Sequence, residues 1–218
     1  MSFDPIKSSR EAPIFVDMPI GLPAAVGFRD CDLEARRNLR NGRNAVFQVP
    51  DRGYLQCAGK GWECCSSINE RRKKADPDAK GLSQQTCALL PKIKEVDYWL
   101  KDNKQGARRI IETHPVVFFV QASGRYMPKK SLREGRRDRV SVLSAVLAEV
   151  TDEASIQGWV DKRSKEEGLL MKDAKRDDRV DAFACLASAL RHLKGESLEL
   201  PGGRKRIDDE GLPMRIVV

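Results

Sequence analysis

The sequence has few of the features that mark membrane, secreted or zinc-binding proteins. Its longest strongly apolar block, VVFFV at residues 116–120, is far shorter than the roughly 18 residues that a membrane-spanning helix needs. The N-terminal segment MSFDPIKSSREAP has no apolar core of the kind that a signal peptide carries. Only two histidines and no C-x-x-C pair are present, which argues against a zinc site. We therefore expect a cytoplasmic protein without a membrane partner.

Two further features bear on chemistry. No glycine-rich phosphate loop is visible, which argues against a phosphate-handling enzyme of the wider actin-like and RNase-H-like set. The six cysteines are predicted to be reduced thiols, because disulfides are rare in the cytoplasm. Cys57, Cys64 and Cys65 are close enough in sequence to leave a metal or redox role as the alternative.

Positive charge is in excess. The chain has 40 Lys and Arg against 32 Asp and Glu, a net charge of +8, and its pI is about 9.3. Such an excess favours polyanionic partners, and nucleic acid is the first candidate. Basic clusters would hold the phosphate backbone, unless they are only solvated helix faces. The candidate nucleic-acid-binding residues are Arg71, Arg72, Lys73, Lys74, Lys129, Lys130, Arg133, Arg136 and Arg137.

The hydrophobic pattern predicts an α/β fold in a single domain, residues 1–218, with a helical insertion at about residues 60–105. A helix is expected from Ser83, as its N-cap, to Lys101, with Pro91 either kinking it or separating two abutting helices. The polar segment 69–80 is expected to be a solvated helix end and loop. Strands are predicted at residues 14–17, 110–111 and 214–218, and further helices at 29–39, 131–150, 152–168 and 176–195.

The last predicted helix carries three aspartates near its start. Asp177 and Asp181 are four residues apart and lie beside the core face, whereas Asp178 lies further towards solvent. Like charges at this spacing repel, so a counter-cation would stabilise them. The alternative is that Asp177 and Asp178 favour the helix dipole and pair with nearby basic residues. The predicted core face consists of Val180, Phe183, Leu186, Ala187 and Leu190.

Polar side chains also follow two of the predicted strands. Asp17 ends the strand IFV, and Glu112 ends the strand II, with His114 two residues later. In α/β sheets, sites gather beyond the carboxyl ends of strands. Carboxylates from two strand ends and one helix form the ligand set that Mg²⁺ or Mn²⁺ prefers. The alternatives are that Asp17 caps its turn through the amides of residues 20 and 21, and that Glu112 and His114 are ordinary strand-end polar residues.

These motifs together resemble a known family. The segments FVDMPIGLP, RDCDLEAR, AVFQVP, GLSQQTCALLPKIKEVD, ETHP, DDRVDA and DEGLPMRIVV follow one another as in domain-of-unknown-function family 429, which is described as predicted RNase-H-like nucleases. The resemblance covers residues 14–218. It implies an RNase-H-like mixed sheet flanked by helices and a two-metal chemistry with Mg²⁺ or Mn²⁺. In the GLSQQ segment, Lys92, Glu95 and Asp97 would line the site or contact the substrate.

The first hypothesis is therefore a divalent-metal-dependent, RNase-H-like nuclease that hydrolyses nucleic acid phosphodiesters. The family's acidic motifs and its E-x-H-P segment supply the candidate residues. His114 would position water or assist proton transfer. The metal ligands would be Asp17, Glu112, Asp177, Asp178 and Asp181, and the catalytic set would be Asp17, Glu112, His114, Asp178 and Asp181.

Two departures from the family pattern support a second hypothesis. Only 13 residues precede Ile14, too few for the N-terminal strand and hairpin that carry the family's first aspartate. The position after HP is Val116, where the family usually has Glu. We expect either a truncated form, a degenerate homologue that binds without cutting, or a chain that covers its open sheet edge by pairing with a second copy. The alternative function is a degenerate, non-catalytic nucleic-acid-binding or scaffold protein on the same fold.

Overall fold

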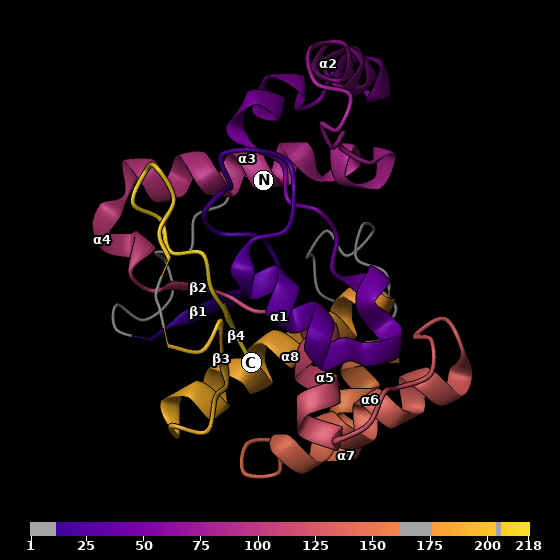
Figure 1. Cartoon of the computed structure of the whole chain (residues 1–218). Helices are drawn as coiled ribbons and strands as arrows, with labels where there is room; N and C mark the ends of the chain where they lie inside the picture. The colour runs from indigo at the N-terminus through magenta and orange to yellow at the C-terminus, as the bar shows by residue number, and fades with distance from the viewer. Residues whose placement is uncertain (1–11, 162–175, 204–205) are drawn as a thin grey trace.

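The computed structural model describes residues 12–161, 176–203 and 206–218. The second half of the helix predicted at 152–168 therefore lies outside the described residues. Helices dominate, with short strands between them (Figure 1). The elements are β1 (Ile14–Val16), α1 (Asp30–Leu39), η2 (Arg40–Ala45), η3 (Arg52–Cys57), α2 (Trp62–Ala75), α3 (Gln84–Asp102), α4 (Lys104–Ala107), β2 (Ile110–Glu112), α5 (Pro115–Ser123), α6 (Arg133–Val146), α7 (Glu153–Asp161), α8 (Arg176–Leu193), β3 (Glu199–Leu200) and β4 (Ile216–Val217).

The strands form two pairs. β1 and β2 are parallel, with Val16 opposite Glu112, and β3 and β4 are antiparallel. Within the described residues no larger sheet is formed. The α/β class is thus confirmed in its coarse form, while the continuous RNase-H-like sheet stays a prediction. Because β1 and β2 run in the same direction, the residues that follow them leave the pair on the same side.

The elements are arranged in three parts (Figure 1). The pair α2 and α3 lies at one end of the molecule, and α5 to α8 form a bundle at the other. β1, β2 and α1 lie between them, and α8 packs against β1. None of the helices in the described ranges is both long and apolar enough to cross a membrane.

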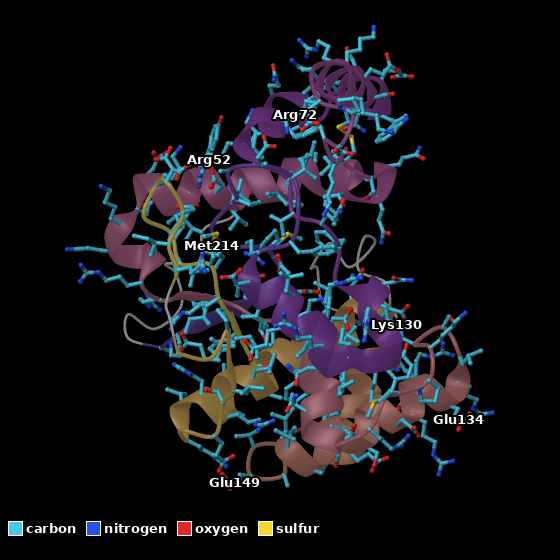
Figure 2. The ribbon with its side chains drawn as sticks, viewed as in Figure 1. Arg52, Arg72, Lys130, Glu134, Glu149 and Met214 are labelled. Atoms are coloured by element: carbon cyan, nitrogen blue, oxygen red, sulfur yellow. A yellow bond between two sulfur atoms is a disulfide. The ribbon has the colours of Figure 1, made fainter. Side chains whose placement is uncertain are left out.

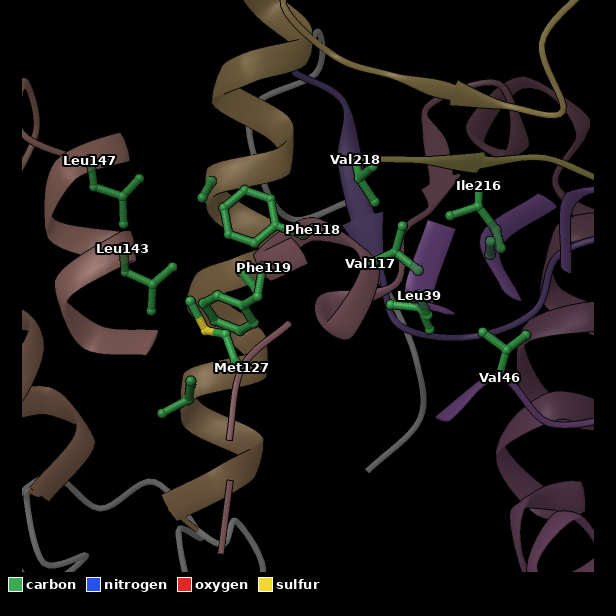
Figure 3. Packing of buried hydrophobic residues seen from close by; sticks show 14 of the residues in the cluster. Leu39, Val46, Val117, Phe118, Phe119, Met127, Leu143, Leu147, Ile216 and Val218 are labelled. Carbon is green, nitrogen blue, oxygen red and sulfur yellow. The ribbon is translucent and has the colours of Figure 1, made fainter. Parts of the chain in front are cut away.

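The main core fills the bundle end (Figure 3). Phe118 and Phe119 of α5 pack edge to face at 5.3 Å and contact the side chains of Met127, Leu143 and Leu147 in the same cluster. Burying each such side chain contributes about 1.5–3 kcal/mol. The apolar block VVFFV lies inside α5, which starts with a proline in its first turn and ends at a left-handed glycine.

The cysteines of the other end correct one prediction. Cys57 is bonded to Cys64 and Cys65 to Cys87, which joins η3, α2 and α3. The prediction of reduced thiols is wrong for these four, because folding brings their Cα atoms to 5.5 and 6.5 Å, within reach of a disulfide. Cys31 and Cys185 are free.

Helix boundaries follow local chemistry closely. The Ser83 side chain accepts from the amide of Thr86, so its predicted role as the N-cap of α3 is confirmed. Pro91 does not divide this helix into two; α3 is one element with the proline on its exposed side. The expected helix end and loop at residues 69–80 are confirmed, because α2 ends at Ala75 and a loop follows.

A buried arginine joins the segments around β1 and β2. Arg29 is 4% exposed, and its guanidinium bonds the carboxylates of Asp32 and Glu112 at 2.8 and 2.5 Å. It also donates to the carbonyls of Ile20 and Gly21 at 2.7 and 3.2 Å. The amide of Ile20 in turn donates to Glu112. One side chain thus ties the turn after β1, the end of β2 and the start of α1 together.

We predict that Arg29→Met destabilises the fold by about 3–5 kcal/mol, because it leaves two buried carboxylates without their cation. Urea unfolding would measure the loss. Arg37→Met on the exposed side of α1, the helix that follows Arg29, is the control and should cost at most about 0.5 kcal/mol. Equal stability of the two variants would contradict this view of Arg29.

Candidate functional site

Asp17 leaves the end of β1 and meets α8. The residue is exposed to solvent, and the charge of its carboxyl interacts with that of Asp181. Burial and, secondly, the charge of Asp181 raise the pKa of Asp17 to about 7, against the opposing charge of Lys130. The strand-end aspartate and one aspartate of the last helix therefore lie within electrostatic reach of each other, and a metal shared between them stays a prediction.

The three aspartates of α8 differ in their surroundings. Asp181 is the most enclosed, with a side chain 17% exposed, and its Oδ2 lies 2.7 Å from Nζ of Lys130. Asp177 is half-buried, and Asp178 is exposed, on the solvent side as its helical position predicts. Burial alone would lower the pKa of Lys130. The net pKa is raised, because the ammonium bonds to Asp181 and is attracted by the charges of Asp181, Asp177 and Asp17. Three carboxylates thus act on one ammonium group.

Cys185 confirms how closely β1 and α8 approach. It lies one turn after Asp181, and its thiol adjoins the backbone of Asp17. Burial, together with the charges of Asp17 and Asp181, raises the pKa of this thiol, so it stays protonated at neutral pH. Cys185 is therefore a packing residue of the site rather than a thiolate nucleophile.

Glu112 and His114 lie on the other side of Asp17. All three line a cavity of about 30 Å³ together with Asp32 and Arg29, which is room for one water molecule. Glu112 does not stand free, because Arg29 and the amide of Ile20 bind its two oxygens. Burial raises the pKa of Glu112 to about 7, although Arg29 stabilises its ionised form.

Of the two ring nitrogens of His114, one has a hydrogen-bond partner among the described residues and the other has none. Nε2 lies 3.3 Å from the carbonyl of Ala45, whereas Nδ1 is buried and has no partner among the described residues. Burial lowers the pKa of His114, so the ring is neutral at pH 7. A neutral ring that donates through Nε2 leaves the lone pair of Nδ1 available to a water molecule.

The structure therefore divides the predicted carboxylates into two sets that meet at Asp17. Glu112 belongs with Arg29 and Asp32, and Asp181 belongs with Lys130 and Asp177. In the described part of the chain, no three potential ligands lie close enough to hold an ion by themselves. A Mg²⁺ ion is commonly held by one or two carboxylates and otherwise keeps its waters, so Asp17 and Asp181 are the residues that could hold one.

The predicted basic residues fall at two separate places. Arg72 on α2 and Lys130 before α6 lie far apart (Figure 2). Arg72 pairs with Asp51 and lies 4.6 Å from the centre of the Tyr54 ring, so it supports the fold. The side chain of Arg136 turns back to backbone carbonyls. The exposed members of the set are Arg71, Lys73 and Lys74 on α2, and Lys129, Arg133 and Arg137 at or just before the start of α6.

Sequence reasoning missed several residues of this region. It assigned no role to Arg29 and Asp32, although the motif RDCD carries both, and it placed Lys130 on the substrate rather than on Asp181. Lys92, Glu95 and Asp97 do not line this cavity, and their contact with a substrate stays a prediction. Lys92 and Glu95 pair with each other away from the cavity, and Asp97 binds Arg52, which also binds Asp208.

Comparison with known proteins identifies a family without a described activity. The model of a family described as "Protein of unknown function (DUF429)" matches residues 3–206. No curated protein and no solved structure matches the chain.

The geometry predicts how Asp17 titrates in the metal-free protein. Its pKa should lie near 7. Asp181→Asn should lower it by removing a like charge, and Lys130→Met should raise it by removing a cation. Carboxyl ¹³C NMR across pH 4–9 (roughly the range needed to bracket both protonation states) would measure these shifts. Asp102→Asn, at the exposed end of α3, is the control. Titration near the ordinary aspartate value would contradict the arrangement.

Proposed function

This chain belongs to the family of proteins of unknown function DUF429, and we propose that it is a divalent-metal-dependent nuclease of RNase-H-like type. The observation that carries the proposal is the interaction of Asp17 with Asp181 at the end of a parallel strand pair, where Asp181 forms an ion pair with Lys130. Such a pair of facing carboxylates has a net negative charge that favours a cation.

Asp17 and Asp181 would hold Mg²⁺ or Mn²⁺, and Asp177 would add negative charge beside them. The bound ion would supply activation of a water molecule and stabilisation of the leaving oxygen in phosphodiester hydrolysis. Glu112 and Asp178 were predicted as further ligands. Glu112 instead accepts a hydrogen bond from the amide of Ile20. This bond fixes the turn after β1 and, with it, the position of the backbone that carries Asp17. Its contribution to the site is therefore one of positioning.

His114 has the properties of a group that places water. It lines the same small cavity as Asp17, it is neutral, and its Nδ1 has no partner in the described structure. A water molecule in this cavity would donate to Nδ1 and lie within reach of Asp17. This fits the predicted role of His114 in positioning water or accepting its proton.

The substrate would be a nucleic acid bound along the start of α6. Lys129, Arg133 and Arg137 are exposed there, and Lys129 directly precedes Lys130 in the chain. Arg133 and Arg137 are one helical turn apart, so their side chains lie on the same face. Contacts of this kind hold phosphates without reading bases, and they weaken as salt is added.

Two observations favour a second function, a non-catalytic nucleic-acid-binding protein. Arg29 and Lys130 already neutralise Glu112 and Asp181. Val116, at the position where the family usually has a carboxylate, packs partly buried against the main core. A protein of this kind would bind nucleic acid in a salt-dependent manner and leave it intact with either metal.

We predict that the purified protein cleaves labelled nucleic acid in the presence of Mg²⁺ or Mn²⁺, with single-stranded, duplex and hybrid substrates tested separately. Asp17→Asn and Asp181→Asn should each reduce the rate about 100-fold or more, because each removes a metal ligand. Asp102→Asn should retain full activity. Binding without cleavage under every metal and substrate would favour the second function.

We also predict that the two basic clusters differ. The double change Arg133→Gln and Arg137→Gln should weaken nucleic-acid binding and reduce the slope of log affinity against log salt by up to about 2. The matched change Arg71→Gln and Lys73→Gln on α2 removes the same charge at the distant end and should have a smaller effect. Fluorescence anisotropy at several salt concentrations would measure both. A larger effect from α2 would place the interface there instead.

A further inference from the structure

Lys130 occupies the position where the proposed site needs a cation. Its Nζ lies 2.7 Å from Asp181 Oδ2, and it also experiences the charges of Asp177 and Asp17. Among the described residues, Arg139 of α6 also faces these aspartates; it is buried and donates to the carbonyls of Pro128 and Gly135 at 2.8 and 2.7 Å. Arg139 is thus bound to backbone, whereas Lys130 is paired to a candidate metal ligand.

The backbone that carries Lys130 is held firmly. Arg136 donates to the carbonyls of Lys130 and Ser131 at 3.2 and 2.9 Å, and Arg139 holds Pro128. Gly135 packs so closely on this loop that a Cβ there would lie 2.2 Å from the carbonyl oxygen of Lys129. Two arginines and a glycine of α6 therefore fix the loop at residues 128–131 against the helix.

The side chain of Lys130, in contrast, is free to move. It is 42% exposed, and its ammonium is carried on a flexible four-carbon stem. Ion pairs that are open to solvent to this degree change an equilibrium constant only a few-fold. Lys130 can therefore leave Asp181 at little cost while its backbone stays in place.

We propose that Lys130 is the resident counter-ion of the site, which leaves Asp181 when a divalent cation binds and then pairs with a phosphate of the nucleic acid. This inference rests on the proposed function. It makes metal binding and nucleic-acid binding cooperative. The Lys130 ammonium competes with the metal ion for Asp181, and once displaced it becomes a partner of the nucleic-acid phosphate. Lys129 and Arg133 on either side would extend the phosphate contact.

The test is Mn²⁺ binding to the full chain without nucleic acid, measured by electron paramagnetic resonance or calorimetry. Lys130→Met should bind Mn²⁺ about 3- to 10-fold more tightly than the wild type, since the competing ammonium is gone. Lys130→Arg keeps the charge and should bind as the wild type does. Lys60→Met, an exposed lysine beside α2, removes the same net charge and should change the affinity less than 2-fold.

A second measurement uses an oligonucleotide in the presence of Mn²⁺, with the catalytic step blocked by a non-hydrolysable phosphorothioate backbone. Lys130→Met should bind it more weakly although it binds the metal more tightly. A merely structural lysine would weaken both, together with the thermal stability. Unchanged or weaker Mn²⁺ affinity of a folded Lys130→Met protein overturns the inference.

The outcomes separate the two proposals. If the wild type cleaves nucleic acid and loses activity on Asp17→Asn, while Lys130→Met leaves Mn²⁺ affinity unchanged, only the role of Lys130 fails. If neither protein binds Mn²⁺, both fail. If Lys130→Met gains Mn²⁺ affinity but no protein cleaves, the counter-ion role holds and the nuclease activity fails.

Discussion

The buried guanidinium of Arg29 is the interaction on which the arrangement of this site depends. Moving an arginine and two carboxylates out of water is costly, and only nearly complete pairing offsets that cost. Here every side-chain nitrogen of Arg29 donates to an oxygen of Asp32, Glu112 or the turn carbonyls. Because these partners come from α1, β2 and the turn after β1, the network fixes the direction in which the chain leaves β1. Asp17 is therefore directed at α8.

The two cations near Asp17 differ in burial, and this separates a structural from an exchangeable ion pair. Arg29 is enclosed and holds two carboxylates with short bonds, so removing it leaves buried charge unpaired. Lys130 is open to solvent and holds one carboxylate. The ion pairs of Arg29 on one side of Asp17 thus stabilise the fold. The ion pair of Lys130 on the other side can be exchanged for another partner.

Local signals predicted much of the fold. The strand before Asp17, the Ser83 cap and the start of the last helix all agree with the structure, since each depends on residues close in sequence. The core face of α8 was partly wrong: Leu186 is 46% exposed, while Ala184 and Ser188 are buried. α8 contacts both the bundle and β1, so small residues occupy the side of the helix that faces these elements. A prediction that looks only for large hydrophobic residues at helical spacing does not detect such a face.

The site was predictable in its residue types but not in its pairing. Asp17 and Asp181 were identified because carboxylates at a strand end and inside a helix are unusual, and the structure brings them together. That Glu112 belongs to Arg29 could not be foreseen, because the two residues are 83 positions apart and either could have met another charge. The disulfides are a similar case, since spacing did not indicate which cysteines meet.

The sequence by itself determined most of the helices, the short buried strands before Asp17 and Glu112, and which acidic residues stand out. These properties follow from side-chain periodicity and local capping, which act over a few residues. Only the tertiary structure decided which cation each carboxylate meets, that VVFFV packs as a helix, and that Lys130 rather than solvent neutralises Asp181. Those outcomes depend on distances between distant parts of the chain, and such distances are set by packing as a whole.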